Sequence, residues 1–197
     1  MTESPRSRCA RKNTRSAVNY FEFQTSMGGI ALIWNEQERL TGIHWIPPQN
    51  TFSSPYPNAR FAPLPSHLWN LVQQLCNYFC FGEPLALLPW EILADPSWTE
   101  FQQRVFKSLL TIPHGETRTY AWLAWKAGKP RATRAVGQVL RKNPLPILIP
   151  CHRVVSKTGM GGFMGKKDPQ HPALKLKEWL IGIENTYRNP LLPCLLH

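Results

Sequence analysis

The sequence predicts an α/β N-terminal domain, with a small antiparallel sheet and one helix, followed by a mostly α-helical C-terminal domain that contains a helix-turn-helix. Short apolar runs separated by turn residues fill residues 17–45, as in a meander of strands. From residue 66 onward, apolar residues recur at helical spacing. A composition change at Ala94-Asp95-Pro96 separates the two parts. We therefore expect a tail at 1–16, domains at 17–95 and 96–185, and a second tail at 186–197.

Composition favours a soluble globular protein with a polyanionic partner. The chain has 197 residues, 43% of them hydrophobic, which is enough for a packed core. Its 23 Lys and Arg against 12 Asp and Glu give a net charge of +11. An odd number of cysteines, five, and the lack of a secretory signal indicate reduced thiols inside a cell, in the cytoplasm of a bacterium or the nucleus of a eukaryote. No apolar run approaches the roughly 20 residues of a membrane helix, and we expect a monomer.

The first 65 residues predict a tail, a sheet and a loop. The polar, Arg-rich stretch 1–16 predicts disorder, and a solubilising role is favoured over contact with nucleic-acid phosphates. Three strands are expected, at 17–24, 30–34 and 40–45. Because the turns between them are short, the strands should form an antiparallel meander. The segment 47–65 is rich in proline and serine and should be a loop.

A helix should follow, with Ser66 as its N-cap. Its core-facing stripe consists of Leu68, Leu71, Val72, Leu75 and Phe79. Cys76 and Cys80 stand four residues apart, a spacing that can hold two metal ligands. No matching ligand set accompanies them, so two buried free thiols are the favoured interpretation, and no metal is expected.

The C-terminal part predicts a helix at 98–110 and then a helix-turn-helix. A short helix at 120–127 is separated by Gly128-Lys129-Pro130 from a second helix at 131–141. On the second helix, one side is apolar and should pack: Val136, Val139 and Leu140. The other side carries Arg134, Gln138 and Arg141, which are then free to contact nucleic acid.

Cys151-His152-Arg153 is the candidate reactive centre. The apolar run before it should be buried and mostly extended, and the two basic neighbours can favour the thiolate. The alternative is a buried structural thiol. Consecutive residues of an extended chain point to opposite faces, so His152 should reach the sulfur through a water and needs a carboxylate to orient it. Glu184 flanks the apolar stripe of the last helix, whereas Glu178 falls on the opposite side, so Glu184 is the better candidate.

Several ordered motifs carry a resemblance to a known family. They are Thr119-Tyr120, Arg134-Ala-Val-Gly137, Asn143-Pro-x-Pro146-Ile-x-Ile-Pro150, Pro150-Cys-His-Arg-Val154, the glycine-rich segment 159–165, and Lys177-Glu-Trp-Leu180 to Glu184. Together they resemble the methylated-DNA-protein-cysteine methyltransferases, also called O6-alkylguanine-DNA alkyltransferases. The resemblance covers the C-terminal half in detail and the N-terminal half by length and pattern only.

The resemblance implies a ribonuclease H-like N-terminal domain, a winged-helix-like C-terminal domain, and DNA repair by direct reversal. An alkyl group on O6 of guanine, or on O4 of thymine, would move irreversibly to Cys151 in a single turnover, without cofactor or metal. Double-stranded DNA would be the partner, bound at its minor groove with the damaged nucleotide flipped out. Glu184 would fix His152, which would take the proton of Cys151 through water, and Asn143 would orient the cysteine loop.

The resemblance also implies roles around the reaction centre. Tyr120 would help rotate the nucleotide, and Arg134 would fill the space that it leaves. With Gln138 and Arg141 of the second helix, Arg153 completes the expected DNA-binding set. The expected pocket residues are Pro146, Val154, Phe163 and Met164.

The pocket departs from the family pattern, and two other functions compete. Phe163 stands where many relatives have tyrosine, and Met164 and Lys166 replace smaller residues, so tolerance for bulky adducts is open. A non-catalytic protein that binds alkylated bases is one alternative, and Cys151 argues against it. A hydrolase with a cysteine-histidine nucleophile is the other; the adjacent placement of the two residues and the basic helix-turn-helix disfavour it.

Overall fold

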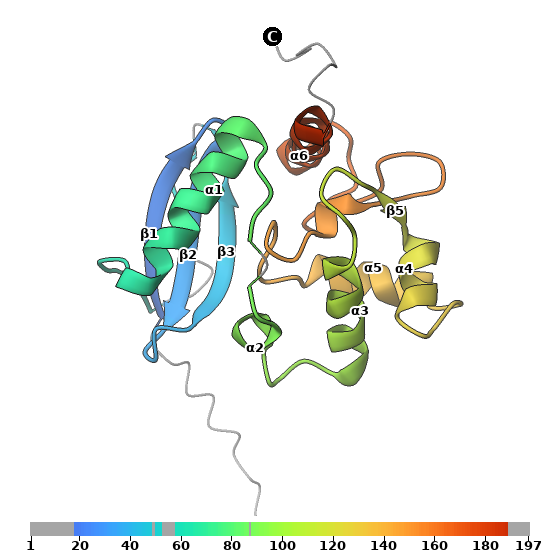
Figure 1. The fold of residues 1–197 in the computed structure, drawn as a ribbon, viewed down its shortest axis with the longest axis horizontal. Helices are drawn as coiled ribbons and strands as arrows, with labels where there is room; N and C mark the ends of the chain where they lie inside the picture. Colours follow the sequence, from blue (N-terminus) through green and yellow to red (C-terminus); the bar gives the residue numbers. More distant parts are fainter. Residues whose placement is uncertain (1–17, 49, 53–57, 87, 189–197) are drawn as a thin grey trace, which may run out of the picture.

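The computed structural model describes residues 18–48, 50–52, 58–86 and 88–188. Its N-terminal half, up to residue 95, holds the sheet, and its C-terminal half, from residue 96, holds most of the helices (Figure 1). Both fold classes expected from the sequence are thereby confirmed in outline. The expected tail at 1–16 and most of the one at 186–197 lie outside the described residues. No helix in the described part of the chain is long and apolar enough to cross a membrane.

The sheet contains the expected antiparallel meander and one further strand. β1 (Val18–Thr25), β2 (Gly28–Asn35) and β3 (Leu40–Ile46) pair in sequence order, which confirms the three predicted strands. β4 (Ala59–Phe61) pairs in parallel with β1, giving the order β3-β2-β1-β4. The sequence analysis placed β4 in the loop 47–65, because three residues are too few to show an alternating pattern.

Helix α1 (Trp69–Phe81) packs across the sheet (Figure 1). The predicted apolar stripe is confirmed, because all five of its members are buried. The prediction that Ser66 caps this helix is wrong. A 3-10 turn, η1 (Ser66–Leu68), precedes α1, and neither element has a side-chain cap at its start. Gly82 ends α1 in the left-handed conformation, φ 71°, and a Cβ there would lie 2.7 Å from the carbonyl oxygen of Ile183.

The two cysteines of α1 differ from the expectation. Cys76 is half-buried and Cys80 is exposed, so the prediction of two buried thiols is wrong. Both lie at the edge of the apolar stripe rather than within it, and burial falls off toward that edge. Both are free thiols, and the described residues contain no cluster of three or more potential metal ligands.

The C-terminal half follows the predicted helices closely. α3 (Glu100–Leu110) starts at a capping box between Thr99 and Gln102, two residues later than expected. α4 (Tyr120–Lys126), capped by the Thr119 hydroxyl, and α5 (Thr133–Arg141) form the predicted pair of helices. The sequence analysis missed the one-turn helix α2 (Trp90–Leu93). The last helix, α6 (Pro172–Arg188), runs three residues past the predicted start of the C-terminal tail.

The segment before Cys151 is buried, as predicted, but it is not extended. Residues 144–149 form turns and bends, in which Ile147 adopts φ 77°. A 3-10 turn, η2 (Cys151–Arg153), then carries the three candidate residues. It leads into β6 (Val154–Val155), which pairs in parallel with β5 (Arg118–Thr119). The compact turn places the side chains of three successive residues in three different directions, which an extended strand would not do.

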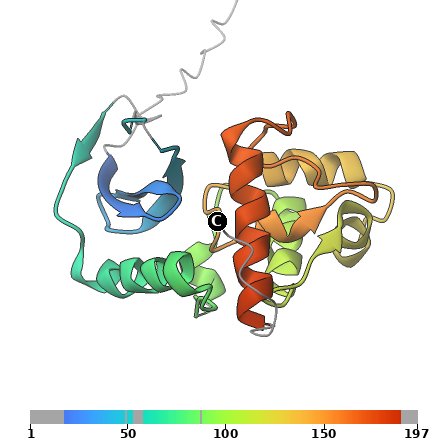
Figure 2. The same ribbon diagram turned by 90° about the horizontal axis from the view of Figure 1, so that it is seen from above.

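The two halves meet at α6 and at the edge of the sheet. Viewed from above, α6 lies on the side of the C-terminal half that faces the sheet and α1 (Figure 2). At the edge strand β3, the backbone N–H of Ile43 donates to the carbonyl oxygen of Pro144 at 2.8 Å. The segment that leads to Cys151 is therefore held by both halves of the molecule.

Candidate active site

Cys151 lies at the start of η2, where it is 5% exposed. The side-chain amide of Asn143 lies 3.1 Å from its sulfur and donates to the carbonyl oxygen of Ile149 at 2.8 Å. The oxygen of the same amide accepts from the N–H of Leu145 at 3.1 Å. Asn143 thus spans the turn and touches the sulfur, the geometry expected of a residue that orients the cysteine loop.

The thiol of Cys151 is protonated at rest. Burial raises its pKa, whereas the hydrogen bond from Asn143 and the charge of Lys177 oppose that increase without cancelling it. The expected contribution of Arg153 to favouring the thiolate is not found, because its guanidinium is directed to Glu184 instead. A separate base must take the thiol proton before the sulfur can react.

His152 is fully buried and has the properties of that base. Its Nε2 lies 2.8 Å from Oε1 of Glu184. Burial lowers the pKa of His152 more than its hydrogen bond to Glu184 raises it, so the imidazole is neutral near pH 7. Its Nδ1 is buried without a hydrogen-bond partner among the described residues. A proton on Nε2 therefore leaves Nδ1 as the atom that can accept another.

Glu184 extends from α6 into the interior, as predicted, and is 1% exposed. Besides His152, it accepts hydrogen bonds from two groups of the C-terminal half, the Arg153 guanidinium at 2.9 and 3.0 Å and the N–H of Gly115 at 3.0 Å. Burial by itself would raise the pKa of Glu184, but its bonds to His152 and Arg153 outweigh burial and hold the pKa well below the usual range. The carboxylate stays ionised and fixes the imidazole. Glu178, the rejected candidate, is exposed and lines the pocket.

Arg153 does not occupy the position expected of a DNA-binding residue. Its guanidinium forks onto Glu184 and also donates to the carbonyl oxygen of Ile112 at 2.9 Å, and its side chain is only 13% exposed. The 3-10 turn directs the side chain inward, which an extended backbone would not require. We correct the assignment: Arg153 belongs to the buried ion-pair network.

Two further buried polar residues contribute to the interior of the site, and neither had a predicted role. Tyr78 of α1 donates its hydroxyl proton to Glu184 Oε1 at 2.6 Å. Lys177 of α6 is fully buried, and its ammonium group donates to the carbonyl oxygens of Val154, Met160 and Gly162 at 2.6, 2.6 and 3.1 Å. Burial lowers the pKa of Lys177 to about 8. Lys177 could have been singled out from the sequence, because a lysine on the apolar side of a helix is unusual.

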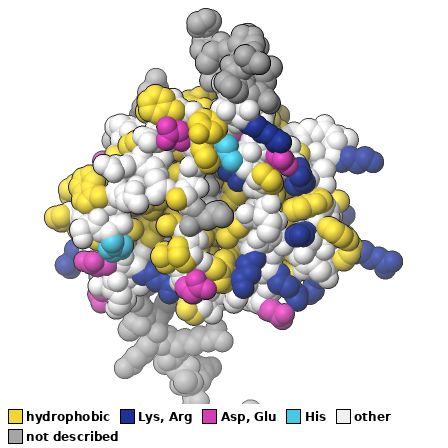
Figure 3. Space-filling model, viewed as in Figure 1, with side chains coloured by type: hydrophobic (Ala, Val, Ile, Leu, Met, Phe, Trp, Pro, Cys, Tyr) yellow, Lys and Arg dark blue, Asp and Glu magenta, His cyan; other side chains and the backbone are white. Residues whose placement is uncertain are grey.

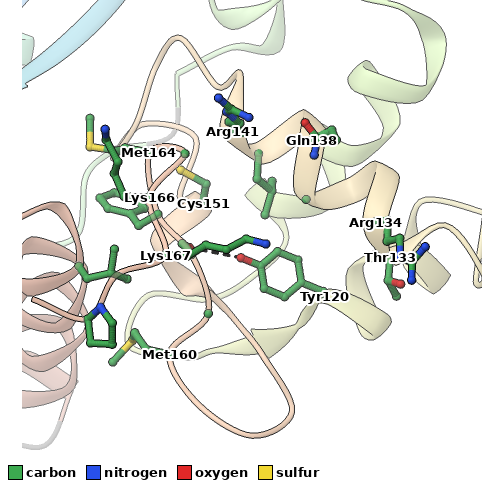
Figure 4. A pocket seen from close by; sticks show the side chains of 18 of the residues that line it. Tyr120, Thr133, Arg134, Gln138, Arg141, Cys151, Met160, Met164, Lys166 and Lys167 are labelled. Carbon is green, nitrogen blue, oxygen red and sulfur yellow. Dashed lines mark hydrogen bonds between the residues drawn. The ribbon is translucent and has the colours of Figure 1, made fainter. Parts of the chain in front are cut away.

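A pocket of about 810 Å³ opens on the other side of the sulfur. Its lining includes Cys151 and six residues that were predicted near the substrate or DNA: Tyr120, Arg134, Gln138, Arg141, Phe163 and Met164. Figure 4 shows Cys151 at one wall, Tyr120 pointing in from another, and the polar residues of α5 along the rim. Tyr120 donates its hydroxyl proton to Gly162 at 3.3 Å, which fixes the ring against the glycine-rich loop.

Two predicted pocket residues do not line this pocket. Pro146 is buried in the turn that leads to Ile149, and Val154 is buried on β6, where its carbonyl oxygen faces Lys177. Both residues were expected in the pocket because of the family resemblance. The observed turns move these two side chains into the interior instead.

Basic residues surround the pocket. Its lining includes four exposed basic residues: Arg134 and Arg141 of α5, and Lys166 and Lys167 of the loop between β6 and α6. In the view of Figure 3, most Lys and Arg side chains lie over the C-terminal half. The apolar side of α5, by contrast, is buried as predicted. This face therefore offers a positive surface around an opening that ends at a sulfur atom.

Comparison with known proteins agrees with these features. Residues 100–186 match the family model described as "6-O-methylguanine DNA methyltransferase, DNA binding domain". The constitutive methylated-DNA--protein-cysteine methyltransferase of Bacillus subtilis is 34% identical over 177 residues, which is 85% of this chain and 96% of the relative. The methyltransferase of the same name from Mycobacterium tuberculosis is 41% identical over 128 residues, 63% of this chain and 66% of the relative.

Solved structures give the same result over most of the chain. The crystal structure of the Mycobacterium tuberculosis O6-methylguanine methyltransferase has a TM-score of 0.70 at 30% identity and covers 86% of this chain and 94% of that one. A crystal structure from the same organism, described as a complex with DNA, has a TM-score of 0.66 with the same identity and coverage. These relationships extend through both halves of the molecule. The chain therefore belongs to the methylated-DNA--protein-cysteine methyltransferase family.

Proposed function

We propose that this protein repairs DNA by direct reversal, moving a methyl or other alkyl group from O6 of guanine to the sulfur of Cys151. One observation carries the proposal: Cys151 lines an open basic pocket, and the next residue, His152, belongs to a buried network with Glu184 that can accept a proton. O4-alkylthymine, which carries its alkyl group on a similar exocyclic oxygen, is a second possible substrate. Family membership supports the same reaction.

The reaction is a displacement at the alkyl carbon. The thiol proton of Cys151 passes through a water molecule to Nδ1 of His152, and Glu184 stabilises the imidazolium that forms. The sulfur then bonds to the alkyl carbon while the bond between that carbon and O6 breaks, and the departing guanine takes up a proton. The product is an S-alkylcysteine, whose carbon–sulfur bond has no comparable leaving group. Each protein molecule therefore acts once, and the chemistry requires no cofactor.

Double-stranded DNA is the proposed partner. The net charge of +11, the matched DNA-binding domain and the DNA complex of the Mycobacterium tuberculosis relative support it. In this proposal α5 lies against the minor groove, and its exposed residues Arg134, Gln138 and Arg141 contact the DNA. Because O6 of guanine is stacked and paired inside the duplex, the damaged nucleotide must rotate into the pocket. Tyr120 would crowd its phosphate, and Arg134 would fill the space left behind.

The finer features of fold and location are part of this proposal. The N-terminal sheet with α1 is consistent with a ribonuclease H-like domain, and β5 and β6 beside α4 and α5 are consistent with a winged-helix-like domain. We place the domain boundary between residues 95 and 96, in the turn between α2 and α3. A protein that repairs DNA would act in the bacterial cytoplasm or the eukaryotic nucleus.

A labelled substrate tests the reaction. Duplex DNA with a labelled methyl group on O6 of guanine should transfer one label to each protein molecule, and peptide mass spectrometry should locate it on Cys151. The variant Cys151→Ser should remain unlabelled, because a serine hydroxyl is a much weaker nucleophile. A wild-type protein that binds the DNA but stays unlabelled would instead indicate a non-catalytic binding protein, and label on Cys151→Ser would place the acceptor elsewhere.

A further inference from the structure

Tyr78 brings a polar group of the N-terminal half into the reaction centre. It lies on α1, far in sequence from the other members, and is 1% exposed. Its hydroxyl oxygen lies 2.6 Å from Oε1 of Glu184 and 3.4 Å from Nε2 of His152. Burial, and then the charge of Glu184, raise the pKa of Tyr78 well above its usual value. The phenol therefore keeps its proton, and the carboxylate is the acceptor.

This contact determines where the proton of His152 lies. The hydroxyl proton of Tyr78 is directed to Glu184, so only a lone pair of the phenol oxygen faces Nε2. Oε1 of Glu184 also presents a lone pair to Nε2. With two acceptors facing it, Nε2 must carry the proton, and Nδ1 is left unprotonated. Nδ1 is the nitrogen that has no partner among the described residues.

We infer that Tyr78 is a positioning residue for alkyl transfer, which holds the Glu184 carboxylate and the His152 proton so that Nδ1 takes the proton of Cys151. The inference rests on the proposed function for its reaction, and on the hydrogen bonds above for its geometry. It assigns to the N-terminal half a direct part in the chemistry of the C-terminal half.

The packing around Tyr78 leaves its ring little freedom. The ring of His114 meets it edge-on, with centroids 6.1 Å apart. The neighbouring residue, Phe79, stacks on Trp179 of α6 with centroids 5.5 Å apart. One turn further, Gly82 presses against the backbone of α6 at Ile183. The contact between α1 and α6 thus fixes the distance over which the hydroxyl reaches Glu184.

Substituting Tyr78 with phenylalanine should change the pH dependence of the reaction. The ionisable groups that face His152 and Glu184 are Tyr78 of α1, His114 of the loop before β5, Cys151 and Arg153 of η2, and Lys177 of α6. The substitution Tyr78→Phe removes only the Tyr78 hydroxyl from this set of groups. Without its donor, the Glu184 carboxylate presents more charge to His152 and stabilises the imidazolium. The neutral base then forms only at higher pH, so the acid limb of the rate profile should rise by about one pH unit.

Two assays on the full chain test this inference. The first measures single-turnover methyl transfer from O6-methylguanine DNA between pH 5 and 9. The second measures alkylation of Cys151 by iodoacetamide over the same range, resolved by peptide mass spectrometry because other cysteines also react. For Tyr78→Phe we expect the acid limb of both assays to move upward, so that transfer at a pH on that limb falls about 10-fold.

Phe79→Leu is the matched control, because Phe79 is equally buried and packs against α6 without a polar contact. It should lower the unfolding temperature and leave the acid limb in place. The inference is overturned if a folded Tyr78→Phe protein has its acid limb at the same pH as the wild type. It is also overturned if Phe79→Leu shifts the acid limb as far as Tyr78→Phe does. If the wild-type protein accepts no methyl group, the proposed function fails, and the iodoacetamide limb still decides the role of Tyr78.

Discussion

The two sides of Cys151 differ in almost every physical property. The interior side is buried, with His152, Glu184 and Lys177 each no more than 1% exposed. The pocket side is open and basic, and its arginine and lysine side chains reach into solvent. On the interior side the Glu184 carboxylate is paired with Arg153, and removing either partner would leave the other charge buried and uncompensated. Charges on the pocket side contribute to encounter with DNA and little to folding.

The largest expected difference between the two sides is at two glutamates of α6. Glu184→Gln leaves the Arg153 guanidinium without its counter-charge, so we expect a loss of roughly 3–5 kcal/mol of unfolding free energy. Glu178→Gln, on the exposed side of the same helix, should change stability by less than about 0.5 kcal/mol. Urea unfolding at pH 7 measures both. If both variants lose the same unfolding free energy, the interior network contributes no more to stability than the surface does.

The same pair predicts a difference in acid sensitivity. The pKa of Glu184 is depressed in the folded protein, so its contribution to stability is complete above the unfolded value of about 4.3. That contribution is lost as the pH falls through the folded value. Between pH 5 and pH 2, the stability of Glu184→Gln should therefore decline less steeply than that of the wild type. A parallel decline of the two proteins would contradict the assigned pKa direction.

Two lysines give a smaller contrast. Lys177→Met removes the donor to three carbonyl oxygens at the base of the glycine-rich loop, and we expect a loss of about 3 kcal/mol. Lys166→Met, on the pocket side, should stay within about 0.5 kcal/mol of wild type. Thermal and urea unfolding give both values. A stable Lys177→Met protein would mean that the loop carbonyls find other donors.

The smallest expected effect is on the pocket side. Arg141→Ala should leave unfolding unchanged within about 0.5 kcal/mol. If Arg141 contacts one phosphate, the slope of log affinity against log salt should fall by about 0.9. Titrating a fluorescent duplex at several salt concentrations measures that slope. Arg60→Ala, an exposed arginine of β4 in the other half, should keep the wild-type slope, and a reduction there would indicate a wider DNA footprint.

Regular periodicity explains what the sequence predicted well. The strands of the meander, the stripe on α1 and the two sides of α5 each repeat a spacing set by backbone geometry. The same reasoning favoured Glu184 over Glu178, because the side of a helix can be read from its apolar stripe. The outline of the fold and the grouping of Cys151, His152 and Glu184 could therefore be predicted from the sequence.

Irregular backbone and tertiary contact explain the remainder. The error at Arg153 arises from the 3-10 turn that replaced an expected extended segment and redirected its side chain. Tyr78 stood beside the stripe of α1, and no local pattern indicates that its hydroxyl meets a residue 106 positions later. The three carbonyl partners of Lys177 were equally invisible, because they come from segments without periodicity.

The bond between Ile43 and Pro144 has a consequence for solubility during partial opening. β3 is an edge strand, and unpaired N–H groups on such a strand can recruit another chain. Pro144 covers one of these groups with a carbonyl, and a proline cannot extend the pairing as a donor. When the halves separate, that protection is lost and the apolar strand is uncovered. Self-association should then begin at β3. On heating, the temperature at which it begins should fall as the protein concentration is increased.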